Sequence, residues 1–261
     1  MQSADELVAR HAELRAHDRY GARILRRNPD TAWPMLQRYY PSASEHIYSL
    51  AGYAGAAQGQ GANGANGGIV AARGARKILQ RPRKLGIGLC FEEAALEPRL
   101  VDGIAALCRR TGYRGVFEAE FVEVDGRALL IDFNPRFYSQ MAFDIDRGMS
   151  LPCLAYADAL DDRASFDALA RAAHAGEAAG GHVYSHRVLF ELMLRAQRAS
   201  GHLSAEELRH WRGWWAEHRA EATDAVGDGH DVAPLAADLL GHLSWFARHP
   251  RSFVRTMVLD R

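Results

Sequence analysis

Apolar and polar residues alternate strongly along residues 115–124 (GVFEAEFVEV), and this alternation predicts a half-buried β-strand. Asp125-Gly126 follows, a dipeptide typical of hairpin turns, and residues 127–133 (RALLIDF) are predicted to be the return strand. Strands are also predicted over residues 35–40, 46–53 and 69–79, with a loop over residues 82–88.

Helical spacing of apolar residues predicts helices over residues 4–17, 97–111 and 151–160. In the second of these, Pro98 suits the first turn, Arg109 and Arg110 suit the last turn, and Gly112 would cap the C-terminus. From His182 onward the pattern is helical, with helices predicted over residues 183–200, 204–221 and 232–248.

The domain organisation follows from these elements. Residues 1–34 form a first helix and a connection, residues 35–160 a mixed domain, residues 161–181 an Ala/Gly-rich linker, and residues 182–261 a helical extension. Residues 55–68 (GAAQGQGANGANGG) have almost nothing to bury and are predicted to be a flexible tip between two strands.

Composition narrows the function classes. The formal net charge of zero argues against a chain that coats nucleic acid. No apolar run approaches the roughly 18 residues of a membrane span, and the acidic, polar start MQSADELVAR is unlike a secretory signal. The scattered cysteines, Cys90, Cys108 and Cys153, fit reduced thiols, so a cytoplasmic location is expected.

The hairpin over residues 116–134 carries the chemistry. One face is apolar, with Phe117, Ala119, Phe121, Ile131 and Phe133. The other face gathers Glu118, Glu120, Asp132 and Asn134. Like charges that face each other across a sheet are destabilising, and a cation is the simplest remedy. Carboxylates with one amide oxygen are hard ligands, which suit magnesium or manganese better than zinc.

The register of the hairpin is a test of a shared metal. A strict two-residue turn at Asp125-Gly126 would place Glu120 opposite Ile131, whereas a three-residue loop would place it opposite Asp132. We therefore predict a three-residue loop with Gly126 at positive φ.

Asn134-Pro135-Arg136 ends the return strand, because proline stops the ladder. An arginine held beside a metal suits a phosphate oxygen. The alternative interpretation is a solvated acidic strand face followed by an ordinary turn.

Glu120, eleven intervening residues and then Asp132-Phe133-Asn134-Pro135-Arg136 resemble the closing motif of ATP-grasp enzymes. The resemblance implies that Glu120, Asp132 and Asn134 bind one or two Mg2+ (or Mn2+) ions that bridge the phosphates of ATP. It also implies that Arg136 contacts the phosphates or an acyl phosphate. Aspartate at position 132 replaces the commoner glutamate of the family.

The resemblance extends upstream. Residues 35–40 resemble the hinge strand that holds adenine, with Gln37 and Tyr39 as candidate contacts, and Glu45 resembles the acid that binds the ribose. Residues 76–82 resemble the strand that places a basic residue near the γ-phosphate. Lys77 is the candidate, and Arg76 would point to the other face.

The implied fold is α+β, an ATP-grasp C-terminal subdomain with an antiparallel sheet and flanking helices, plus an α-helical C-terminal extension. The implied activity joins a small-molecule carboxylate to an amine through an acyl phosphate, with ATP and magnesium, and with neither nucleic acid nor membrane as partner. On this reading residues 1–34 are a remnant of the nucleotide-binding subdomain.

The chain also departs from the family. Its only lysines are Lys77 and Lys84, and the roughly 30 residues before the hinge contain none of the phosphate-binding lysines of the family. A fragment of a longer ligase, completed by a second copy or another chain, is therefore one reading. A non-catalytic nucleotide- or metal-binding subunit and a helical interaction module are the alternatives.

Two other patterns are interpreted structurally. His182 and His186 are four residues apart, a zinc-like spacing on a helix, but no third ligand is evident in the sequence. Trp211, Trp214 and Trp215 have helical spacing and are predicted to pack in a core.

Overall fold

The structure, a computed structural model, describes residues 4–15, 22–33, 36–38, 40, 47–55, 68–83, 86–175, 182–227 and 230–259. The chain divides into two compact units, Met1–Tyr39 and Tyr40–Arg261. The first unit contains α1 (Ala4–Arg15), α2 (Ala22–Arg27) and the short 3-10 helix η1 (Pro29–Ala32), so the first predicted helix is confirmed. Residues 36–38 and 40 have no regular secondary structure, and the strand predicted over residues 35–40 is wrong for them.

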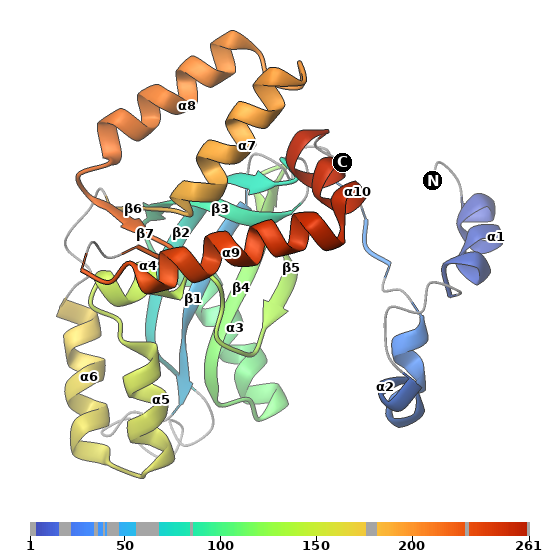
Figure 1. The fold of residues 1–261 in the computed structure, drawn as a ribbon. Helices are drawn as coiled ribbons and strands as arrows, with labels where there is room; N and C mark the ends of the chain where they lie inside the picture. Colours follow the sequence, from blue (N-terminus) through green and yellow to red (C-terminus); the bar gives the residue numbers. More distant parts are fainter. Residues whose placement is uncertain are drawn as a thin grey trace. The chain divides into compact units, whose positions relative to one another are not determined.

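The second unit is built on a seven-stranded sheet in the order β5-β4-β1-β2-β3-β6-β7 (Figure 1). Its strands are β1 (Ile47–Gly55), β2 (Gly68–Arg81), β3 (Ile87–Ala94), β4 (Gly115–Val124), β5 (Arg127–Asn134), β6 (Val183–Ser185) and β7 (Ala222–Asp224). Every neighbouring pair is antiparallel except β6 and β7. The predicted α+β class, an antiparallel sheet with flanking helices, is confirmed.

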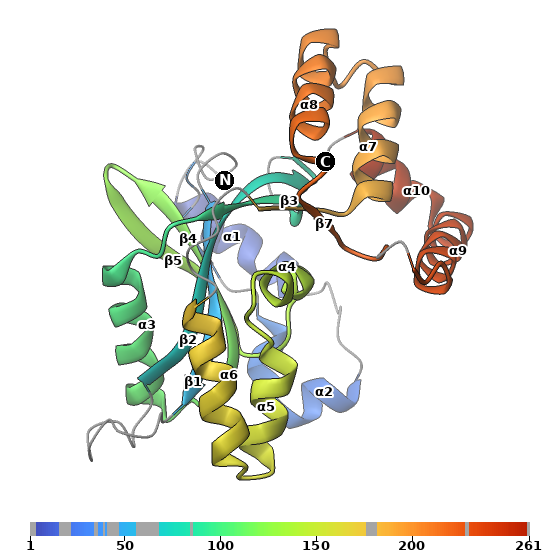
Figure 2. The same cartoon turned by 90° about the vertical axis from the view of Figure 1, so that its left-hand side faces the viewer.

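Helix α3 (Pro98–Thr111) covers one face of the sheet (Figure 2). Its Ile104 and Cys108 are buried against Leu50 of β1 and Phe117 of β4. Gly112 ends the helix with a φ of 66°, the left-handed conformation that glycine adopts without strain, as the sequence predicted. Because this face takes the odd-numbered residues of β4, the even-numbered acids of that strand lie on the other face.

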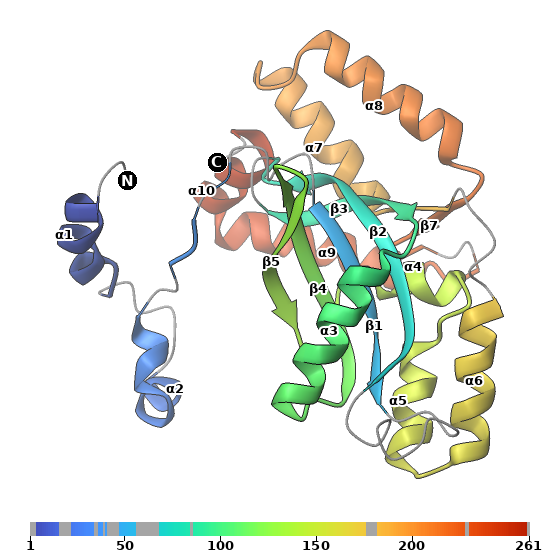
Figure 3. The same cartoon turned by 180° about the vertical axis from the view of Figure 1, so that it is seen from behind.

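Helices α4 (Met141–Asp146), α5 (Leu151–Ala159) and α6 (Arg163–Ala175) lie on the opposite side of the sheet from α3, as Figure 2 shows, and Figure 3 views the sheet from the α3 side. The linker predicted over residues 161–181 is therefore wrong where it overlaps α6. Alanine-rich composition suggested a linker, but Phe166, Ala170 and Ala173 follow helical spacing and are buried together with Tyr53 of β1.

The last part of the chain forms α7 (Arg187–Ala199), α8 (Ala205–His218), α9 (Ala233–Arg248), α10 (Pro250–Phe253) and the π-helical turn η4 (Val254–Val258). Residues 182–261 are not purely helical as predicted, because β6 and β7 extend the main sheet. Two three-residue strands are too short to show a period, and pairing with β3 decides their conformation. The three tryptophans of α8 pack around Phe190 of α7, which confirms their structural interpretation.

None of the described helices is both long enough and apolar enough to cross a bilayer.

Candidate functional site

The β4–β5 hairpin turns more tightly than predicted. Val124 pairs with Arg127, so only Asp125 and Gly126 lie between the strands. Both have positive φ, 51° and 71°, which is the conformation of a two-residue type I′ turn. The predicted three-residue loop is wrong, whereas the positive φ of Gly126 is confirmed.

A β-bulge restores the register that the turn alone would not give. Phe121 pairs with Leu130, but Glu120 pairs with Asp132, so Ile131 is an extra residue on β5. The predicted opposition of Glu120 and Asp132 is confirmed, although the bulge rather than the turn produces it.

A cavity of about 180 Å3 lies over this end of the hairpin. Its polar lining residues are Lys77, Glu118, Glu120, Asp132, Asn134, Arg136, Tyr138, Ser139 and Gln140. The structure therefore brings together the predicted metal ligands and both predicted phosphate-binding cations, from β2, β4, β5 and the segment that follows β5. Arg76 is exposed and is not among the lining residues, as the strand alternation predicted.

Glu118 is the most deeply buried acid of the site, with 3% of its surface exposed. Its Oε1 accepts hydrogen bonds from Ser49 Oγ at 2.7 Å and from Gln140 Nε2 at 3.2 Å. Its Oε2 accepts a hydrogen bond from Asn134 Nδ2 at 2.8 Å. Glu118 lines the cavity, but because both of its oxygens accept hydrogen bonds within the protein, it positions Asn134.

The orientation of Asn134 follows from its two acidic neighbours. Its Nδ2 donates to Glu118 and also to Asp132 Oδ2 at 3.0 Å. Its Oδ1 therefore faces away from both carboxylates, and there it accepts a hydrogen bond from Arg136 Nη2 at 2.8 Å. The short segment Asn134–Arg136 thus holds an amide oxygen and a guanidinium side by side.

Lys77 supplies the second positive charge. Its ammonium forms an ion pair with Glu120 Oε1, and the two side chains are 5% and 17% exposed. Lys77 lies two strands away from Glu120, with β1 between them, and points to the same face of the sheet. The Lys77 ammonium reaches the acids from the β2 side of the sheet, whereas Arg136 follows β5, on the other side of β4.

The titration of Glu118 gives a first prediction. Burial, followed by the negative charge of Glu120, raises the pKa of Glu118 above its ordinary value of 4.5. Between pH 4.5 and the raised pKa the folded protein keeps a proton that the unfolded chain has released. The stabilisation is therefore complete below pH 4.5 and is lost as pH rises through the folded-state pKa.

Glu118→Gln removes this titration, so the difference in unfolding free energy between wild type and variant should fall as pH rises above 4.5. Urea unfolding of both proteins over a pH series measures it. A difference that does not change with pH in this window would contradict the raised pKa.

The residues around the cavity fit a hard divalent cation. Glu120 and Asp132 are directly opposed, and Asn134 has its amide nitrogen fixed so that only its oxygen is available to a ligand. Oxygen ligands of this kind are those that magnesium and manganese prefer. Coordination through Asn134 Oδ1 would require the Arg136 guanidinium to turn away from it.

The contacts predicted for the nucleotide base and ribose stay predictions. Gln37 is exposed and belongs to the first unit, which is described by itself. Tyr39 and Glu45 lie outside the described residues.

Sequence reasoning missed the buried polar network behind the site. Tyr138 lines the cavity and donates its hydroxyl proton to Asp144, which in turn forms an ion pair with Arg147. The Arg147 side chain is 2% exposed, donates to Gly74 O at 2.9 Å and lies over the Phe143 ring at 4.0 Å. The sequence did hold a sign of this network, because the otherwise apolar segment 141–149 contains three charged residues, Asp144, Asp146 and Arg147.

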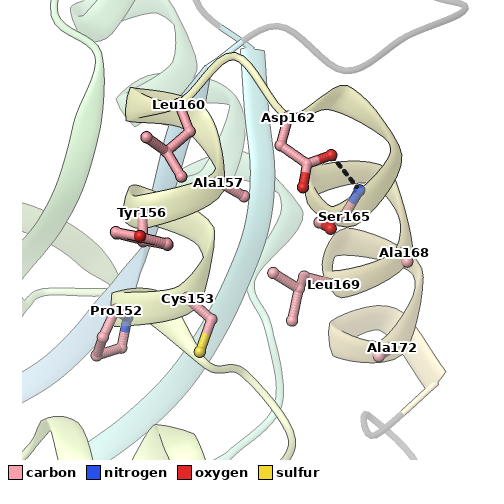
Figure 4. A pocket seen from close by; sticks show the side chains of 10 residues that line it. All are labelled: Pro152, Cys153, Tyr156, Ala157, Leu160, Asp162, Ser165, Ala168, Leu169 and Ala172. Atoms are coloured by element: carbon pink, nitrogen blue, oxygen red, sulfur yellow. Dashed lines mark hydrogen bonds between the residues drawn. The ribbon is translucent and has the colours of Figure 1, made fainter.

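A larger cavity, about 830 Å3, lies elsewhere, between α5 and α6 (Figure 4). Its lining is mostly apolar, with Tyr156, Leu160 and Leu169 among the contributors. The only carboxylate there, Asp162, accepts a hydrogen bond from the backbone of Ser165 at 3.1 Å. The smaller cavity over the hairpin therefore holds the chemically versatile groups.

No protein-family model matches the sequence, and no curated protein is significantly similar to it. Solved structures do match part of the chain, and those found are ATP-grasp family members, the family whose closing motif the sequence resembles. In the six matches compared, the chain spans no more than a third of the length of the other structure.

One similar structure is the phosphoribosylaminoimidazole carboxylase ATPase subunit from Aquifex aeolicus, at 17% identity and a TM-score of 0.31, covering 50% of this chain and 33% of that one. Another is the N5-carboxyaminoimidazole ribonucleotide synthetase from Thermus thermophilus, at 16% identity and a TM-score of 0.29, covering 50% and 31%. A third is the biotin carboxylase domain of a thermophilic 2-oxoglutarate carboxylase, at 15% identity and a TM-score of 0.29, covering 52% and 28%.

Proposed function

We propose that this chain carries the C-terminal subdomain of an ATP-grasp ligase, which binds Mg-ATP and joins a carboxylate to an amine through an acyl phosphate. The observation that carries the proposal is the bulge-set register, which opposes Glu120 to Asp132 and leaves Asn134 Oδ1 directed outward. An ordinary solvated hairpin has no need for a bulge that brings two like charges face to face.

Each residue has a defined part in the proposed reaction. Glu120, Asp132 and Asn134 would hold magnesium, which when bound neutralises charge on the ATP phosphates. Arg136, released from Asn134, would bind an oxygen of the transferred phosphoryl group through its planar fork. Lys77 would add positive charge on the opposite side of that group. Phosphoryl transfer depends mainly on such positioning and charge neutralisation.

Adenine and ribose contacts are assigned in this proposal to Gln37, Tyr39 and Glu45, from the sequence resemblance alone. A second copy or another chain would supply further phosphate-binding groups, because the described residues contribute a single lysine to the site.

Calorimetric titration of the full chain with Mg-ATP tests the proposal. Wild type should bind, and Asp132→Ala and Asn134→Ala should each weaken binding by at least about 10-fold, since even loss of a group hydrogen-bonded to a metal ligand costs about 10–100-fold. Glu123→Ala is the matched control, since Glu123 is an exposed acid of the same hairpin, on β4 close to the turn.

Equal affinity in all four proteins would show that ATP binds elsewhere. No heat of binding in any of them would leave the helical interaction module as the better account of the chain.

A further inference from the structure

A second group of metal-binding side chains lies outside the hairpin site, where α9 passes the N-terminal end of α7 (Figure 1). His186 is the N-cap residue of α7, and Asp238 and His242 are four residues apart on α9. The sequence alone gave His186 no further ligands, because these residues are about 50 positions away. His182, its expected helical partner, is separated from it by β6 and faces Glu93 instead.

The three side chains converge. Among the described residues this is the one set of three or more His, Cys, Asp or Glu residues whose ligand atoms all lie within 4.8 Å of one another. The acids Glu118, Glu120 and Asp132 do not form such a set, since Glu118 is turned into its hydrogen bonds with the protein.

The spacing of the ligand atoms is too long for hydrogen bonds and suits a shared ion. Asp238 Oδ1 is 3.4 Å from His242 Nε2, and Asp238 Oδ2 is 3.8 Å from His186 Nε2. Two ligands bound about 2.0–2.1 Å from a tetrahedral zinc ion lie about 3.3 Å apart.

Burial of polar atoms that lack hydrogen-bond partners lowers the stability of the folded protein. His186 Nδ1, Asp238 Oδ2 and His242 Nε2 are buried and have no hydrogen-bond partner. Buried polar groups are nearly always paired, and each unpaired one costs about 1–3 kcal/mol. A metal ion would satisfy the last two of these atoms at once.

We propose that His186, Asp238 and His242 bind a zinc ion, with a fourth coordination position open to solvent. Imidazole and carboxylate are established zinc ligands, and three protein ligands leave one position for water or an anion. The open side faces a cavity of about 450 Å3, which Asp238 and His242 line together with Arg81 and Trp245. The guanidinium of Arg81 lies over the Trp245 ring at 5.5 Å and favours an anionic fourth ligand.

The site would also join two parts of the fold. Bound metal would tie α9 to the start of α7 and thereby to strand β6 of the main sheet, because β6 ends at Ser185, directly before His186. This role does not depend on ATP.

Titration of the metal-free full chain with zinc chloride tests the proposal. Wild type should bind one zinc ion, and His242→Ala and Asp238→Asn should each weaken binding by more than about 100-fold, since even loss of an outer partner costs about 10–100-fold. His249→Ala, an exposed histidine just beyond the same helix, should bind like wild type. Asp132→Ala should also bind like wild type, which separates this site from the hairpin site.

Two further measurements keep the test independent of folding defects. Cobalt substituted for zinc should give the visible absorption of a four- or five-coordinate site in wild type and lose it in His242→Ala. Zinc should raise the thermal unfolding temperature of wild type but not of His242→Ala, whose circular dichroism should be unchanged. Equal zinc affinity in wild type, Asp238→Asn and His242→Ala would overturn the proposal, as would the absence of one-to-one binding.

Discussion

Arg147→Met should lower the free energy of unfolding by about 3–5 kcal/mol, the typical cost of breaking a buried ion pair by removing one partner. Arg147 and Asp144 are 2% and 3% exposed, so the remaining carboxylate cannot be hydrated without opening the structure. The substitution also removes a donor from Gly74 O and the contact with the Phe143 ring. Methionine keeps most of the side-chain volume, so cavity formation adds little.

Denaturant unfolding at neutral pH measures this change, with the slope against denaturant expected to stay constant. The double variant Arg147→Met/Asp144→Asn is the control. Its asparagine is uncharged and still accepts the hydroxyl proton of Tyr138, so much of the lost stability should return. A loss below about 1 kcal/mol in Arg147→Met would show that the pair is worth no more than a surface ion pair.

Lys77→Met should have two opposite effects on ligand binding. Removing the ammonium leaves Glu120 with its full charge beside Glu118 and Asp132, so Mg2+ alone should bind more tightly than to wild type. Mg-ATP should bind more weakly, because the cation proposed to face the phosphates is gone. Stability should fall by about 3 kcal/mol, the lower end of the range for a broken buried pair, since the Glu120 side chain is 17% exposed.

Paired titrations with MgCl2 and with Mg-ATP separate these effects. Arg76→Met is the matched control, because Arg76 is the adjacent basic residue of the same strand, is exposed, and lies on the opposite face of the sheet from Lys77. It should leave both affinities unchanged. If Lys77→Met changes the two affinities in the same direction, Lys77 acts only as a structural partner of Glu120.

Much of the hairpin was predictable because its signals are local. Alternation over ten residues, a strong turn dipeptide and a proline at the end of β5 each act within a few positions, and together they predicted which side chains share the acidic face. The bulge was not predictable, because residue 131 is an ordinary isoleucine. The requirement that Glu120 and Asp132 lie opposite each other showed that β5 needs one residue more than β4. We expected that extra residue in the turn, whereas it forms the bulge at Ile131.

Signals that depend on distant pairing were missed. β6 is a strand because β3 offers it a free edge, and its three residues, Val183–Ser185, carry too little pattern to show this. Ser49 and Gln140 orient Glu118 from positions 69 and 22 residues away, and neither stands out in the sequence. Asp238 and His242 lack any sequence link to His186. Long-range contacts therefore account for both the buried supports of the hairpin site and the proposed zinc site.

The extra residue Ile131 divides the hairpin into two segments whose pairing registers between β4 and β5 differ by one residue. Beyond it, towards Asp125 and Gly126, the pairing follows the turn; before it, towards Asn134, the pairing is shifted by one residue. Adding or removing a whole residue pair in the outer arm would leave Glu120 opposite Asp132, whereas a change of one residue on one strand would have to be taken up by the turn or by the bulge. Positions on β5 are therefore best counted from Asn134 rather than from the turn, because the residues on the Asn134 side of the bulge carry the acids of the site.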